Sequence, residues 1–185
     1  KGFGYQVLGF GAGGAAASTY ITATGGTISC SGDYRIHTFT GDGTFCVSSA
    51  GCFAPCSGTG SNTVDYLVIA GGGSGGYSEA VIGGGGAGGY RESPGTANGS
   101  YTVSPLGTSP AVALPVCAQG YPITVGAGAV GAPNPSPGPV GSNSVFSSIT
   151  STGGGGGAYK TGSPSGGPAS AGGSGGGGAF GFSAA

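Results

Sequence analysis

The sequence has very few charged or large apolar side chains. It contains no Met and no Trp, and only 5% of its residues are charged. With so few large apolar side chains, an ordinary hydrophobic core would be thin for 185 residues. Hydrogen-bonded backbone must therefore supply part of the cohesion. Low charge with a mean hydropathy of +0.18 is also atypical of disordered chains, which owe their solubility to charge.

Several classes of function are disfavoured by what is missing. The net charge is −1 without a basic patch, which argues against nucleic-acid binding. The longest apolar stretch, Val64 to Ala70, contains Asp65 and is far too short to span a bilayer, so no membrane insertion is expected. No signal peptide is visible, and a chain that begins at Lys1 fits a fragment or a processed product.

Cysteine and histidine are too sparse to predict a metal site. The chain has five cysteines, and only Cys52 and Cys56 are close together in sequence. A zinc site needs four ligands at suitable spacing, and the single His37 is distant from that pair. The odd number of cysteines leaves at least one unpaired or intermolecular. We expect a local disulfide, Cys52–Cys56, or buried free thiols, and no metal.

Catalytic motifs are also missing. Strings of the form G-x-G-x-x-G occur by chance in a glycine-rich chain, and no helical periodicity is present to complete a dinucleotide site. No P-loop lysine follows Gly71–Gly76. Asp33, Asp42 and Asp65 are imaginable as a carboxylate pair for glycan cleavage, but the first two lie in turn signals, where aspartate commonly bonds its own backbone. We expect no enzymatic activity and no cofactor.

Glycine is what the sequence has in abundance, with 49 residues of 185. The average share in proteins is about 7%. Much of it lies in five dense runs, Gly71–Gly76, Gly83–Gly89, Gly126–Gly131, Gly153–Gly157 and Gly172–Gly178. A strict Gly-X-Y period is absent, which excludes collagen. Glycine loses the most backbone entropy on ordering, so these runs either stay loose or pack backbone against backbone.

The second option predicts a bundle of polyglycine II helices. In this threefold extended helix each residue advances about 3.1 Å without internal hydrogen bonds, so a run of this length makes a rod of roughly 16–22 Å. Buried backbone groups must find partners, and only glycine lets neighbouring rods approach on every side. Loops would join the rods at alternate ends of the bundle. These loops can vary freely, so we expect the binding residues there.

The remaining segments predict short strands and almost no α-helix. Residues 34–40 predict a strand whose side chains point alternately to its two faces. The Gly41-Asp42-Gly43 turn signal then predicts that residues 44–48 return as its hairpin partner. Residues 63–70 read as a nearly continuous apolar strand, which suggests burial on both faces. We therefore expect an all-β fold with irregular structure, in which a small antiparallel β-sandwich (about residues 20–70 plus short later strands) joins the glycine bundle of residues 71–185.

Aromatic and charged residues between the glycine runs are the candidate binding residues. Tyrosine provides a large contact area at low entropy cost. The candidates for receptor contact are Tyr77, Tyr90, Arg91, Tyr101, Tyr159 and Lys160. The alternative is that these side chains cap the ends of the bundle and touch no ligand. Residues 1–19 precede the domain as an arm that is either a frayed terminus or an attachment segment, with Phe3, Tyr5, Leu8 and Phe10 as its candidate assembly contacts.

A series of short sequence motifs resembles a known family. The motifs are Thr24–Thr27, Gly32–Thr40, Gly43–Phe45, Val64–Gly73, Gly84–Glu92, Tyr121–Gly128 and Gly141–Phe146. In this order they resemble the glycine-rich domain of bacteriophage tail proteins, over about residues 20–180. The cysteines at positions 46, 52, 56 and 117 and the Pro-rich stretch 132–139 depart from that pattern and suggest covalent bracing and a chain-specific insertion.

The resemblance implies a structural protein on the virion surface, in a phage tail fibre or tail tip. Its loops would recognise a bacterial receptor, either an outer-membrane protein or a glycan. Other partners would be further tail and fibre proteins or copies of the chain. A self-assembling extracellular fibre subunit with a purely structural role is the alternative, favoured by the low charge, the odd number of cysteines and the apolar arm.

Overall fold

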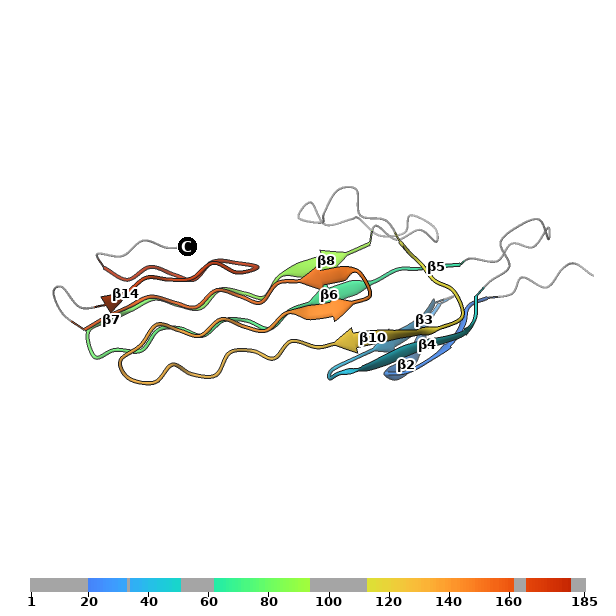
Figure 1. The fold of residues 1–185 in the computed structure, drawn as a ribbon, viewed down its shortest axis with the longest axis horizontal. Helices are drawn as coiled ribbons and strands as arrows, with labels where there is room; N and C mark the ends of the chain where they lie inside the picture. Colours follow the sequence, from blue (N-terminus) through green and yellow to red (C-terminus); the bar gives the residue numbers. More distant parts are fainter. Residues whose placement is uncertain (1–19, 33, 51–61, 94–112, 162–165, 181–185) are drawn as a thin grey trace, which may run out of the picture.

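The computed structural model describes residues 20–32, 34–50, 62–93, 113–161 and 166–180, and the molecule has two parts (Figure 1). One part is a set of short strands, and the other is a bundle of extended glycine-rich segments that runs away from them. Every regular element in the described ranges is a β-strand, so the predicted all-β class without α-helix is confirmed. No helix able to cross a membrane occurs in this part of the chain.

A five-stranded antiparallel sheet joins the two halves of the sequence. Its order is β1 (Thr22–Thr24), β4 (Gly43–Ser49), β10 (Gly120–Thr124), β11 (Ser144–Phe146) and β12 (Ile149–Ser151). Early strand β4 pairs with late strand β10, with Tyr121 opposite Phe45. The bundle is therefore anchored at several points, because segments that leave and re-enter it belong to this one sheet.

The chain passes from this sheet to a second layer and back. Strand β2 (Thr27–Ser31) pairs with β3 (Tyr34–Thr38) in a hairpin, whose turn contains Gly32 with φ 55°. The predicted pairing of residues 34–40 with 44–48 is wrong, because β3 pairs with β2, whereas β4 pairs with β1 and β10. The chain does reverse near Gly41, but the two strands on either side of that turn belong to different sheets.

The predicted strand 63–70 is split and only half-buried. It forms β5 (Thr63–Val64), paired with β9 (Leu114–Pro115), and β6 (Leu67–Ile69), paired with β8 (Tyr90–Glu92). Val68 is buried, but Leu67 and Ile69 are 57% and 56% exposed, so burial on both faces is wrong. A strand made of apolar residues is buried on both faces only where other elements pack against each face. Here other residues pack only against the face that carries Val68.

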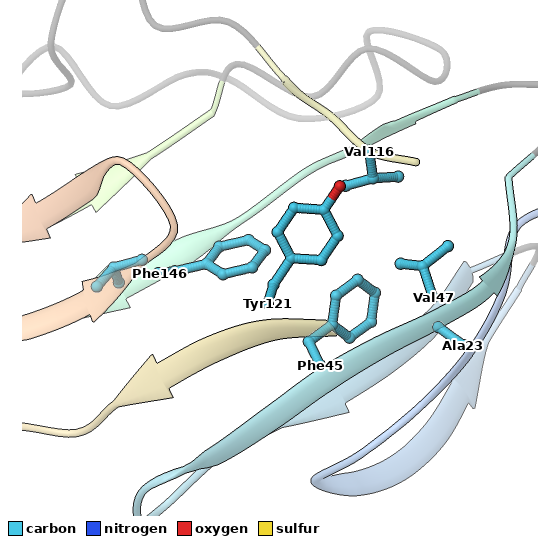
Figure 2. Packing of buried hydrophobic residues seen from close by; sticks show 7 residues of the cluster. Ala23, Phe45, Val47, Val116, Tyr121 and Phe146 are labelled. Atoms are coloured by element: carbon cyan, nitrogen blue, oxygen red, sulfur yellow. The ribbon is translucent and has the colours of Figure 1, made fainter. Parts of the chain in front are cut away.

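A small aromatic core lies among these strands (Figure 2). The Phe45 ring makes edge contacts with Phe146 and with His37, at centroid distances of 6.0 and 5.1 Å. Tyr121 is 5% exposed, and its hydroxyl accepts a hydrogen bond of 2.8 Å from the Cys117 amide. Ala23, Val47, Val68 and Val116 complete the buried cluster. Edge-to-face geometry is the favoured arrangement for aromatic pairs.

The bundle consists of extended segments joined by hydrogen bonds at a three-residue spacing. Residues 70, 73 and 76 donate to the carbonyls of residues 89, 86 and 83. These two segments, residues 70–76 and 83–89, are therefore antiparallel. Residues 154 and 157 donate to the carbonyls of residues 71 and 74, so these two segments are parallel. In a β-sheet, a strand bonds the same neighbour at every second residue. Here the bonds to one neighbour recur only at every third residue, so the residues in between can bond other segments.

Residues 153–158, called the central segment below, are buried along their whole length. Each of their backbone N–H and C=O groups has a hydrogen-bond partner, most of them backbone groups of surrounding segments. The two side-chain partners are Asn143 Oδ1, at 2.9 Å from the Gly153 nitrogen, and Ser170 Oγ, at 3.1 Å from the Gly156 nitrogen. The surrounding segments are residues 71–74, 83–86, 138–141, 170–173 and 174–177.

Glycine is required in the central segment by space and not by backbone conformation. Among the described residues, glycines with positive φ are confined to Gly25, Gly26 and Gly32 in the β part. A Cβ atom on Gly156 would instead collide with the carbonyl of Gly138, and one on Gly153 with that of Gly141. At the outer position Gly84 an added Cβ would meet nothing within 4 Å.

The bundle therefore distinguishes two alanine substitutions. We expect Gly156→Ala to lower the free energy of unfolding by about 3 kcal/mol, because the colliding atoms belong to backbone that cannot rotate away. Gly84→Ala should change it by about 0.5 kcal/mol or less, since the site is open. Guanidinium unfolding followed by tyrosine fluorescence measures both. Equal effects of the two substitutions would contradict the packing described here.

A second prediction concerns the side chain that caps the buried Gly156 amide. Ser170→Ala should cost about 1–3 kcal/mol, because it leaves a buried N–H without an acceptor. Ser174→Ala is the matched control, since Ser174 bonds its neighbours through its backbone N–H and C=O. Unfolding curves give the cost, and amide hydrogen exchange locates it. Faster exchange at Gly156 is expected in the Ser170 variant alone, and unchanged protection there would count against this role.

Candidate functional site

The end of the bundle farthest from the core strands, called the distal tip below, brings together three of the six candidate binding residues, Tyr77, Tyr159 and Lys160 (Figure 1). It is formed by a small three-stranded sheet of β7 (Val81–Ile82), β13 (Tyr159–Lys160) and β14 (Gly166–Gly167), with β13 in the middle. Tyr77 and Ser136 add an isolated bridge, in which each amide donates to the other residue's carbonyl at 2.9 and 3.1 Å. Residues distant in sequence are thus fixed together by backbone hydrogen bonds.

Three large side chains at the tip expose apolar surface. Tyr77 is 51% exposed, Ile82 56% and Phe180 80%. The Lys160 ammonium lies 5.1 Å from the centroid of the Phe180 ring, a cation–π contact. Isolated exposed apolar side chains are ordinary, but several gathered at one end of a rigid support are typical of interaction sites.

The two residues of β13 differ in what they contact. The Tyr159 ring packs on Gly167, where an added Cβ would lie 2.7 Å from the ring. Tyr159 therefore contributes to closing the end of the bundle, as the capping alternative expects. The Lys160 carbonyl accepts a hydrogen bond from the Ser78 hydroxyl, and the Lys160 ammonium lies beside the Phe180 ring.

A shallow cavity of about 240 Å³ adjoins these residues. It is lined by Glu79, Asn134, Pro135 and Thr161, and the Asn134–Pro135 peptide bond is cis. The Ser136 hydroxyl donates to the Pro133 carbonyl at 2.8 Å, which ties this Pro-rich loop to itself. Glu79 and Lys160 are the charged groups at the tip that the structure describes, so the surface offers one charge of each sign beside apolar contacts.

Not all predicted site residues lie at the tip. Tyr90 and Arg91 belong to β8, beside the core strands at the other end of the bundle. The Tyr90 hydroxyl donates to Glu92 at 2.6 Å, and an Arg91 guanidinium nitrogen donates to the Tyr90 carbonyl at 3.1 Å. The predictions for Tyr101, for a Cys52–Cys56 disulfide and for Phe3, Tyr5, Leu8 and Phe10 lie outside the described residues.

Sequence reasoning missed Ile82 and Phe180 at the tip. Ile82 ends the short insertion that begins at Tyr77, and Phe180 follows the last glycine run, so both flank a glycine run directly. An apolar residue next to a glycine run marks the end of an extended segment. Neither residue is a tyrosine or carries a charge, and the sequence-based prediction of binding residues rested on those two properties.

In the described ranges, no three His, Cys, Asp or Glu side chains gather as a metal site. Asp42 accepts a hydrogen bond of 2.8 Å from the Val125 amide, so it braces a distant strand end and does not bond its own turn. Asp65 accepts from the Ser93 hydroxyl at 2.8 Å. Cys30, Cys46 and Cys117 are free and exposed, so the expectation that free thiols are buried is wrong for these three.

Comparison with known proteins identifies the family. No curated protein and no solved structure gives a significant match to the chain. The sequence model of one protein family, described as a glycine-rich domain, matches residues 48–184. That range covers the whole bundle, the distal tip and all strands from β5 onward. The chain therefore belongs to this glycine-rich domain family.

Proposed function

We propose that the chain is a virion-surface component of a phage tail fibre or tail tip, and that its distal tip binds a receptor on the bacterial surface. The observation that carries this proposal is the exposed group of Tyr77, Ile82 and Phe180, with Lys160 beside Phe180, at the far end of the bundle. The proposed link to phage tails rests on the resemblance of the sequence motifs, including their non-glycine residues and their order along the chain.

The bundle suits such a role because the hydrogen bonds of its central segment are made within the bundle and involve none of the exposed tip side chains. We take the extended segments to be polyglycine II helices. The three-residue hydrogen-bond spacing, the neighbours in both chain directions and the absence of positive φ in the described bundle glycines support this assignment. Substitutions at the tip would then alter the binding surface while the central segment keeps the fold.

The chemistry of the tip favours binding over catalysis. Aromatic and aliphatic side chains with one lysine and one glutamate provide contact area and orientation. We therefore propose a non-enzymatic protein that works without a cofactor, located on the virion and hence outside the cell. Its partners would be a bacterial surface molecule at the tip and neighbouring tail proteins elsewhere.

One observation favours a second function, a subunit of a self-assembling fibre. On the outside of the bundle, Gly85, Gly128 and Gly131 form no hydrogen bonds to other described residues. Such exposed backbone could bond a neighbouring copy, as an open sheet edge does. Light scattering and electron microscopy of the purified full chain decide: a monomer at high concentration would remove this alternative.

The receptor proposal predicts that tip substitutions abolish cell binding without unfolding the chain. The purified, fluorescently labelled chain is tested on a panel of bacterial strains and on envelope vesicles prepared from them. We expect Tyr77→Ser and Phe180→Ser each to weaken binding about tenfold or more, as for central interface aromatics. Unfolding curves should stay unchanged, since both side chains are exposed.

The control for this experiment is Leu67→Ser. Leu67 is 57% exposed on β6, near the core strands and away from the tip. It should leave binding unchanged. Equal losses from the control and the tip variants, or tip variants that bind as well as the unaltered chain, would refute the placement of the receptor site.

A further inference from the structure

A second hollow lies in the β part, where the chain crosses between its two layers. The connection from β1 to β2 and the connection from β3 to β4 lie side by side and line an open, shallow cavity of about 290 Å³. This volume is near the lower limit of small-molecule sites. The cavity shares no residue with the distal tip.

The shape of this cavity is set by two glycines. Gly25 and Gly26 have φ of 108° and 63°, a region that other residues rarely adopt. A Cβ on Gly26 would lie 2.6 Å from the Thr38 carbonyl oxygen, and one on Gly25 would collide with the Thr44 carbonyl. The Gly25 carbonyl also accepts a hydrogen bond of 2.8 Å from His37 Nδ1. The two connections are therefore held in close contact.

The lining combines hydroxyl groups with one carboxylate and one aromatic ring. The side chains that carry this chemistry are Thr27, Thr38, Thr40, Thr44, Asp42 and Phe39. A threonine hydroxyl both donates and accepts hydrogen bonds, and a carboxylate accepts only. Because one Asp42 oxygen is already bonded to the Val125 amide, that carboxylate is held in place while its second oxygen can accept from a ligand.

This set of groups selects among ligand classes. No Lys, Arg or His is part of the described lining, so phosphate and other anions find no counter-charge there. The single carboxylate is too few for a cation site. Dense hydroxyl groups beside an aromatic ring match a ligand that carries many hydroxyls and an apolar C–H face.

We propose that this cavity binds one residue of a neutral glycan. The threonine hydroxyls and the free Asp42 oxygen bond the sugar hydroxyls, and the half-buried Phe39 ring packs against the C–H face of the sugar. The Phe39 ring is fixed in place, since it packs against the hydrophobic core and lies within 3.3 Å of where a Cβ atom on Gly25, Gly26 or Gly43 would be. Its use in host recognition rests on the proposed function, whereas sugar binding itself is a property of the purified chain.

The test is a ¹H–¹⁵N NMR titration of the purified full chain. The probes are maltohexaose and chitohexaose, with 3′-sialyllactose as the charged comparison. We expect at least one neutral oligosaccharide to shift the amide resonances of Gly25, Gly41 and Thr44, and the sialylated probe to bind more weakly. The double variant Thr40→Val, Thr44→Val should weaken binding about tenfold or more, because valine keeps the shape of threonine and removes its hydrogen bonds.

Thr150→Val is the matched control, since Thr150 is an exposed strand residue outside the cavity. It should leave the titration unchanged. The proposal is overturned if neither neutral probe shifts these resonances at millimolar concentration, if the sialylated probe binds better, or if the control loses as much as the double variant. Tyr77→Ser should not alter the titration, so this result and the result of the tip experiment are separable.

Discussion

The structure depends on finding a partner for every buried backbone polar group of the central segment, and other backbone groups supply all of these partners except Asn143 Oδ1 and Ser170 Oγ. In the central segment, six residues that carry at most a methyl group form a core in which N–H and C=O groups replace apolar packing. The three-residue spacing is what makes this arrangement possible, because successive residues of the central segment bond different neighbouring segments. The small aromatic core around Phe45 packs strands of the sheet against Val68 and Val116, beside the bundle.

Local sequence predicted the elements better than their pairing. The glycine runs identified most of the extended segments, although residues 138–141 lie outside them, and strand β3 lies within the predicted strand 34–40. The partner of β3 did not follow, because a turn at Gly41 is compatible both with a hairpin and with a crossing between layers. The exposure of Leu67 and Ile69 was missed for a similar reason, since a sequence does not state which faces of a strand are covered.

The candidate site was predicted in part, and the error has a simple geometrical origin. Tyr77, Tyr159 and Lys160 lie together at the tip, whereas Tyr90 and Arg91 lie at the opposite end. Consecutive segments run in opposite directions, so the residue after the first segment lies at the tip and the residue after the second lies back at the strands. Counting segments would have separated these residues. Phe180 was not predictable as the partner of Lys160, because their contact joins two segments that share no local pattern.

The orientation of the hydrogen bonds has a mechanical consequence. The segments lie side by side along the long axis of the bundle, and their bonds join neighbours across that axis. A pull applied between the tip and the strands would therefore load these bonds in shear, many at once, whereas a sideways peel would break them one after another. The molecule should resist tension along its length much better than a hairpin of the same size opened from its end.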